Sequence, residues 1–153
     1  YFQILYNMNK LKGPYDINQM IAEFFQKYKY SNILHWFDTD MKPVLNFDVY
    51  HTPFDKTKGY QIYHRDDFDL LLIRMENLNA CYERAFLEFM GISIPELTLV
   101  NISQKLSYGE VYKKFKKQIV FSESYLKEMY ESKYVKHFYT LEEIQEFKTK
   151  YGH

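Results

Sequence analysis

The sequence has few of the residues from which cross-links, metal centres and phosphate-binding loops are built. Its 153 residues contain one cysteine, Cys81, so a disulfide framework and a cysteine-based zinc site are excluded. The five glycines are dispersed, and the motifs G-x-x-x-x-G-K-[ST], G-x-G-x-x-G, H-E-x-x-H and G-x-S-x-G do not occur. A self-contained nucleotide-dependent enzyme is therefore not expected, and no spacing of residues predicts a bound metal.

Long apolar runs and an excess of charge of one sign are also missing. No apolar run approaches the roughly 18 residues that a membrane span needs, and this absence, with the lone Cys81, predicts a soluble protein of the reducing cytoplasm. Twenty basic and twenty acidic residues cancel, which argues against nucleic acid as a partner. Residues 105–153 carry 10 Lys and Arg against 7 Asp and Glu, so an anion site is expected in that part of the chain.

Aromatic side chains, in contrast, make up 20% of the sequence. Flat amphipathic rings stack on sugars or bases, but the same rings also fill a core, and the composition leaves both interpretations open. The length suits a single domain over residues 1–153, because a chain of this size buries roughly two thirds of its unfolded surface.

The apolar spacing predicts a helix-rich α/β fold. Asp16 precedes apolar residues at helical spacing up to Tyr28, so we expect a helix capped by Asp16. Further helices are expected at residues 36–45, 78–90, 107–119, 123–130 and 141–151, and strands at residues 59–64, 70–75 and 97–102. Asn46 and Gly91 are the expected left-handed helix ends, and Thr140 with Glu143 forms a capping box.

The strand at residues 70–75 has an unbroken Leu-Leu-Leu-Ile core. Strands that are covered on both faces lack polar alternation in this way. We therefore expect this strand inside a short parallel sheet, away from its edge, and the following helix to form half of a β-α-β unit.

Arg74 and Glu76 lie at the carboxyl end of that predicted strand. Ligands bind beyond this end in open α/β sheets, so both are candidate substrate-binding residues. The alternative is that they fix the strand end to a neighbouring loop or cap the next helix.

His35, Trp36 and His51 place two imidazoles and an indole near Asp38 and Asp48. All three are candidate substrate-binding residues, since a histidine can accept a proton from an acceptor hydroxyl. The alternative is that they are histidines and rings without a catalytic task, and the sequence identifies no catalytic base.

A basic segment joins the last two predicted helices. It contains a hydroxyl, two ammonium groups and an imidazole from Ser132, Lys133, Lys136 and His137. With the amides that begin the Thr140-capped helix, these groups are candidates for holding a phosphate or sulfate. A solvated basic loop is the alternative.

The stretch "LLLIRMENLNACYERAFLEFMGI" at residues 70–92 resembles the sulfotransferase superfamily. In those enzymes a strand ending in an Arg-aromatic-Glu-Asp-Leu motif leads to a helix that closes in Phe-Leu-Gly. The matching residues are Arg74, Glu76, Leu78, Phe89 and Gly91, whereas Met75 and Asn77 depart from the pattern.

A more specific resemblance covers about residues 35–151. The stretches "HWFDTDMKPVLNFDVYHTPFDKTKGYQI" and "SKYVKHFYTLEEI" resemble the bacterial family of putative capsular polysaccharide synthesis proteins, which is regarded as sulfotransferase-like. That family has a Lys-Trp-Tyr-Ser-like sequence where this chain reads Lys-Leu-Ser-Tyr at residues 105–108, so the match departs there.

The resemblance implies the helix-rich C-terminal part of a P-loop-like sulfotransferase fold, which transfers sulfuryl from the donor PAPS to a glycan hydroxyl. Donor contacts would come from Lys133, Lys136 and His137, and acceptor contacts from residues 35–60. Because the donor loop of such enzymes lies upstream of the matched region, a missing N-terminal half or a partner chain is implied, and this chain alone is expected to be inactive. The alternative is a non-catalytic module that binds a glycan or a protein through exposed aromatics.

Overall fold

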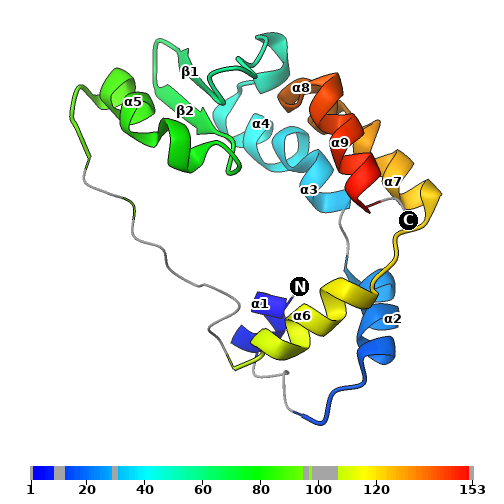
Figure 1. Ribbon diagram of the computed structural model, residues 1–153. Coiled ribbons are helices and arrows are strands. Elements are labelled where there is room, and N and C mark those ends of the chain that lie inside the picture. Colours follow the sequence, from blue (N-terminus) through cyan, green and yellow to red (C-terminus); the bar gives the residue numbers. More distant parts are fainter. Residues whose placement is uncertain (1, 9–12, 29–30, 95–96, 98–106, 152–153) are drawn as a thin grey trace.

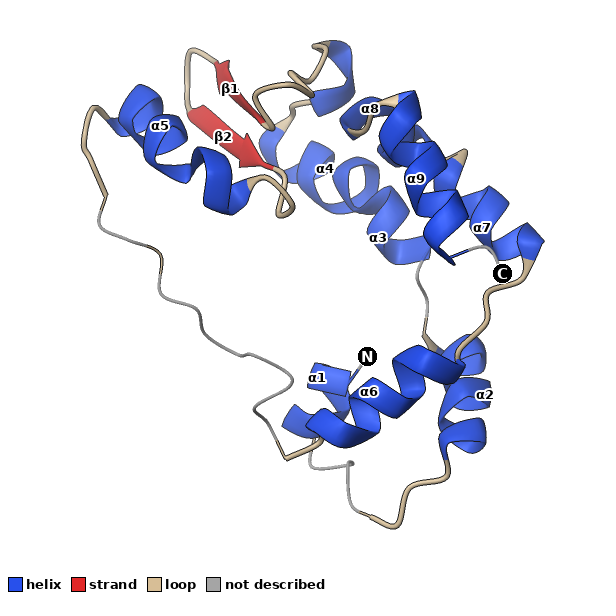
Figure 2. Cartoon of the chain, viewed as in Figure 1, coloured by secondary structure: helices blue, strands red, loops and turns tan. Residues whose placement is uncertain are grey.

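The computed structural model describes residues 2–8, 13–28, 31–94, 97 and 107–151, and most of them are helical (Figures 1 and 2). The elements are α1 (Phe2–Asn7), α2 (Ile17–Lys27), α3 (Ser31–Trp36), the π-helical turn η1 (Phe37–Met41), α4 (Lys42–Leu45), the 3-10 turn η2 (Val49–His51), β1 (Tyr60–His64), β2 (Asp69–Ile73), α5 (Leu78–Met90), α6 (Gly109–Gln118), α7 (Glu123–Tyr130), α8 (Lys133–Phe138) and α9 (Leu141–Tyr151). Within the described ranges, no helix combines the length and the apolar character needed to cross a bilayer.

Helix α2 begins where the sequence predicts. The Asp16 carboxylate accepts two backbone hydrogen bonds from the first turn, at 2.9 and 3.1 Å, and so caps the helix. The apolar face of α2 is half-buried against an aromatic cluster of Phe2, Tyr108 and Phe115, which belong to α1, the start of α6 and α6 itself. These three helices pack together, apart from the hairpin (Figure 1).

Strands β1 and β2 form an antiparallel hairpin, so the predicted parallel sheet is wrong. Tyr60 pairs with Ile73 and His64 with Asp69, and the Arg65 amide donates to the Phe68 carbonyl at 3.0 Å across the turn. A turn of this length can join only antiparallel neighbours, because a parallel pair needs a crossover of a dozen or more residues. The described residues therefore contain no β-α-β unit.

The apolar run of β2 nevertheless meets apolar residues on both faces. Leu71 and Ile73 pack against α5, in a cluster with Tyr60, Cys81 and Ala85, whereas Leu70 and Leu72 pack on the opposite cluster around Val49, Phe54 and Phe138. The missing polar alternation thus has the expected cause. The predicted position of β2 inside the sheet is wrong. The sheet that the described residues form has two strands, so each strand is an edge strand, and residues 70–73 are only half-buried.

Helix α5 follows β2 and ends as predicted at Gly91, whose φ of 70° is left-handed. Asn77 occupies the N-cap position, but its side chain makes no capping hydrogen bond. Cys81 lies on the buried face of α5 as a free thiol.

The predicted helix at residues 36–45 is longer than expected and is not regular. It runs from Ser31 to Leu45 through α3, η1 and α4, and the Lys42 amide donates to the Phe37 carbonyl across the wide π turn. Pro43, which has no amide hydrogen, follows directly, and Asn46 ends the helix with a φ of 46°.

Helices α6, α7 and α9 confirm the C-terminal predictions. The capping box of α9 is present: the Thr140 amide donates to Glu143 at 2.8 Å and the Glu143 amide to the Thr140 hydroxyl at 3.2 Å. The predicted loop at residues 132–139 is instead the short helix α8. The predicted strand at residues 97–102 lies outside the described residues except for Leu97, which is in no strand.

Candidate functional site

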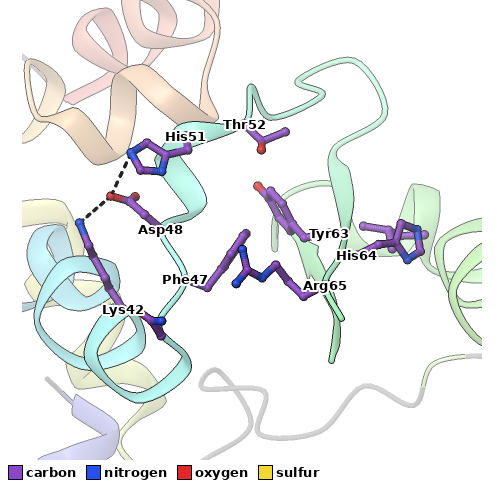
Figure 3. A pocket seen from close by; sticks show the side chains of 10 residues that line it. Lys42, Phe47, Asp48, His51, Thr52, Tyr63, His64 and Arg65 are labelled. Carbon is purple, nitrogen blue, oxygen red and sulfur yellow. Dashed lines mark hydrogen bonds and ion pairs between the residues drawn. The ribbon is translucent and has the colours of Figure 1, made fainter. Parts of the chain in front are cut away.

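A pocket of about 620 Å³ lies between the segment α4–η2 and strand β1 (Figure 3). One wall consists of Lys42, Asn46, Phe47, Asp48, His51 and Thr52, and the other of Ile62, Tyr63, His64 and Arg65. Small-molecule sites measure roughly 300–1,000 Å³ and carry a few polar groups among apolar ones. This pocket has both properties, and we take it as the candidate functional site.

The helical wall is shaped by the end of α4. The left-handed Asn46 turns the chain out of the helix, and the Asp48 carboxylate then accepts the Tyr50 amide at 3.0 Å and caps η2. These two turns place Phe47, Asp48 and His51 along one side of the pocket (Figure 3).

Asp48 is the one carboxylate in the lining, and it is already paired. The Lys42 ammonium donates to it at 2.8 Å, and His51 Nε2 lies 4.0 Å from the same oxygen. The hydrogen bond to Lys42 lowers the pKa of Asp48, although burial of the carboxyl opposes the shift. The side chain of His51, by contrast, is 84% exposed.

The strand wall contributes Tyr63 and Arg65. Tyr63 is 4% exposed, and its hydroxyl has no hydrogen-bond partner among the described residues. Burial raises the pKa of Tyr63 to about 12, so the hydroxyl remains a donor at neutral pH. The Arg65 guanidinium lies over the Phe47 ring at 5.9 Å and forms no ion pair with any described carboxylate. His64 is paired with Asp69 at 2.9 Å.

Helix α8 packs against the α4–η2 wall of the pocket through contacts of Lys133 and His137. The Lys133 ammonium binds Asp38 at 3.0 Å and lies 3.8 Å above the Tyr50 ring, which in turn meets His137 edge-on at 5.0 Å. Burial, with Asp38 next in strength, raises the pKa of Tyr50. These contacts fix η2, and with it His51, against α8.

The four residues predicted to hold the donor all belong to α8 or its cap. Ser132 caps the helix, donating to the Met129 carbonyl at 2.7 Å and accepting the Val135 amide at 3.2 Å. The Nε2 atom of His137 is buried and has no hydrogen-bond partner within the described ranges, and burial lowers the pKa of His137. Lys136 is exposed, and its carbonyl accepts the Lys56 ammonium at 2.9 Å. With Lys133 paired to Asp38, Lys136 is the member of this set whose charge has no partner within the described residues.

Arg74 is buried at 6% exposure and lies away from the pocket lining. Its guanidinium forms a bidentate pair with Glu143, donates to the Phe138 carbonyl at 3.0 Å, and lies 4.4 Å from the centre of the Tyr139 ring. Glu76 accepts the Tyr139 hydroxyl at 2.9 Å. Both residues therefore join the end of β2 to the α8–α9 corner, which is the structural alternative that the sequence left open.

His35 and Trp36 lie on α3, outside the pocket lined by His51. Trp36 is 48% exposed beside a shallow hollow of about 320 Å³, lined also by Asn32, Ile33, Phe37 and Tyr134. His35 is exposed, and its carbonyl accepts the Thr39 hydroxyl. Of the nine predicted site residues, all of which the structure describes, His51 lines the pocket and the other eight do not.

Sequence reasoning missed Lys42, Asp48, Thr52, Tyr63 and Arg65 as lining residues. The signal was present in part, because the stretch at residues 35–62 contains three of these five and is one of the two stretches that carry the most specific family resemblance. No group of three or more metal-ligating side chains occurs among the described residues, and the expectation that no metal binds stays a prediction.

The family comparison bears on residues 6–140, which include the pocket, the hairpin and α8. Over this range the chain matches the family model described as "Putative capsular polysaccharide synthesis protein". The chain belongs to this family. Searches of curated proteins and of solved structures give no match. The description of this family suggests involvement in capsular polysaccharide synthesis.

Proposed function

We propose that this protein acts in capsular polysaccharide synthesis by binding a saccharide in the pocket between α4–η2 and β1. The observation that carries the proposal is the lining itself. Two aromatic rings, two hydroxyls, two imidazoles and a guanidinium that forms no ion pair within the described residues surround about 620 Å³. A sugar offers ring hydroxyls to such groups and an apolar face to an aromatic ring.

The mouth of the pocket gives His51 a position from which to act on a bound hydroxyl. Its imidazole is exposed, yet η2 is fixed by the Asp48 cap and by the contacts of Tyr50 with Lys133 and His137. A positioned histidine is suited to accept a proton from a hydroxyl within hydrogen-bond reach. His51 is therefore the candidate general base.

Titration of a capsular oligosaccharide, followed by changes in the NMR spectrum of the protein, tests saccharide binding. We expect His51→Ala to weaken binding several-fold, because one polar contact is worth about 1 kcal/mol. His35→Ala removes an equally exposed histidine outside the pocket and serves as the matched control. Equal effects of the two variants, or no binding of saccharide by the unmodified protein, would contradict the proposal.

A finer proposal is sulfuryl transfer from PAPS to the bound glycan, and it rests on the sulfotransferase resemblance of residues 70–92. The described residues do not by themselves fit the donor, because Ser132 and Lys133 are held by internal contacts and the Nε2 atom of His137 is buried. A donor site would need a further segment or a partner chain. Adenosine 3′,5′-bisphosphate titrated into the full-length protein and into the Lys133→Ala/Lys136→Ala variant tests this, and equal affinities would remove both lysines from a donor site.

The exposed Trp36 favours a second candidate, a non-catalytic glycan-binding module. The indole borders a hollow with Phe37 and Tyr134, and such a ring can stack on a sugar. Under this alternative, Trp36→Ala abolishes glycan binding whereas His51→Ala leaves it intact.

A further inference from the structure

The charges lining the pocket do not cancel. Lys42 is neutralised by Asp48, the one carboxylate of the lining, while Arg65 has no such partner. Asp66 and Asp67 follow Arg65 in the turn, but neither approaches its guanidinium within ion-pair distance in the structure. With neutral histidines, the lining therefore carries one uncompensated positive charge.

The Tyr63 hydroxyl is a second incomplete group on the same wall. It is buried with its side chain, faces the Thr52 side of the pocket (Figure 3), and has no hydrogen-bond partner in the part of the chain that the structure describes. An unsatisfied buried donor costs about 1–3 kcal/mol, so native structures rarely keep one without a purpose. An acceptor atom of a ligand would satisfy the hydrogen-bonding capacity of the Tyr63 hydroxyl.

From these two groups we infer that the pocket selects a saccharide residue carrying one anionic group, which binds Arg65 while a ring or anionic oxygen accepts a hydrogen bond from Tyr63. The inference rests on the proposed saccharide function and specifies its substrate class. A guanidinium donates in a planar fork that matches two oxygens of one acidic group. Arg65 also lies over the Phe47 ring, which restricts its orientation toward the pocket.

The size of the charge discriminates between acidic sugars. A uronic acid carboxylate or a sulfate ester carries one negative charge and leaves the lining neutral. A phosphate monoester carries about 1.5 to 2 negative charges near neutral pH, which overcompensates the lining and adds repulsion from Asp48. The pocket therefore suits a monovalent acidic sugar.

A matched set of probes tests the inference on the full chain by isothermal titration calorimetry. The probes are a uronate-containing tetrasaccharide, the same tetrasaccharide after reduction of its carboxyl groups, and neutral tetrasaccharides bearing one sulfate or one phosphate ester. We expect the uronate form to bind about tenfold or more tightly than its reduced form, as one charge-assisted contact predicts. Tighter binding of the sulfate ester than of the uronate supports the same site with sulfate as the source of the charge.

Three variants assign the effect to the pocket. Arg65→Gln should abolish the preference for the acidic form, whereas Arg84→Gln, which alters an exposed arginine on α5, should keep it. Tyr63→Phe should weaken binding of the acidic sugar several-fold without lowering stability, because the hydroxyl that it removes has no partner in the protein.

The outcomes separate this inference from the function on which it rests. Equal binding of the uronate and reduced forms, or a preference for the phosphate ester, overturns the inference and leaves saccharide binding standing. A preference that survives Arg65→Gln also overturns it. If no probe binds, the proposed function and the inference fail together.

Discussion

Arg74, which directly follows β2, allows a direct test of whether this end of the strand serves stability rather than binding. Its guanidinium donates to the Phe138 carbonyl, pairs with Glu143 and covers the Tyr139 ring, while the side chain is only 5% exposed. A hydrogen bond of a charged group, such as the Arg74 guanidinium, contributes about 1.5–3 kcal/mol, and a cation–π contact about 0.5–1 kcal/mol. Arg74→Met keeps much of the apolar volume, so we expect a loss of about 3 kcal/mol.

The assay is urea unfolding followed by circular dichroism, with a parallel thermal scan. A loss of about 3 kcal/mol corresponds to a fall in Tm of about 6–12 °C for a chain of this size. Glu143→Gln should cost less, because the carboxylate is 30% exposed. The double variant should show a coupling of about 1–2 kcal/mol between the two residues.

Arg84→Met is the matched control. Arg84 pairs with Glu88 one helical turn away at 2.8 Å, but its side chain is 67% exposed, so the loss should stay near 0.3–0.5 kcal/mol. The structural account of Arg74 would be refuted if Arg74→Met cost no more than this control. It would also be refuted if the variant lost saccharide binding while its stability was unchanged.

Three further predictions concern a glycine, a histidine and the cysteine. Gly59→Ala should destabilise the protein by about 2 kcal/mol or more in urea unfolding, because φ at Gly59 is 75° and an added Cβ would lie 2.5 Å from Asn77. The control Gly91→Ala should cost only about 1 kcal/mol, because φ at Gly91 is 70° but an added Cβ would meet open space. Equal losses in the two variants would contradict this reasoning. Burial lowers the pKa of His137, so as pH falls below about 6.5 the unfolded chain binds a proton first and stability declines. His137→Asn should flatten this decline between about pH 6.5 and 5 in a series of urea titrations, and an unchanged slope would exclude His137 as its source. Cys81 is buried, and burial raises the pKa of its thiol. The thiol should therefore react with a disulfide reagent only as fast as the protein opens. Rapid reaction in native buffer would contradict the buried position of Cys81.

The sequence by itself determined several helix ends at which a side chain acts on its own backbone. Asp16 caps α2, Asn46 and Gly91 end their helices in left-handed conformations, and Thr140 with Glu143 starts α9, because each of these interactions spans only a few residues. The two strands were likewise predicted from their apolar composition and the turn between them. The same turn implied an antiparallel pair, since four residues cannot complete a parallel crossover, and this constraint was overlooked.

Only the tertiary structure decided which residues face one another. Leu-Leu-Leu-Ile indicated a strand covered on both faces, but sequence spacing did not show that α5 and the α4–η2 segment supply the two covers of a simple hairpin. Arg74 and Glu143 lie 69 residues apart in sequence, so their pairing depends on the tertiary structure that brings the end of β2 to the first turn of α9. The candidate pocket also depends on tertiary packing. One wall comes from the α4–η2 segment, with Lys42, Asp48 and His51, and the other from β1 and the turn after it, with Tyr63 and Arg65. The two walls enclose a cavity because the hairpin packs against η2. Local patterns cannot reveal such a site, because the free energy that brings its walls together comes from contacts between distant parts of the chain.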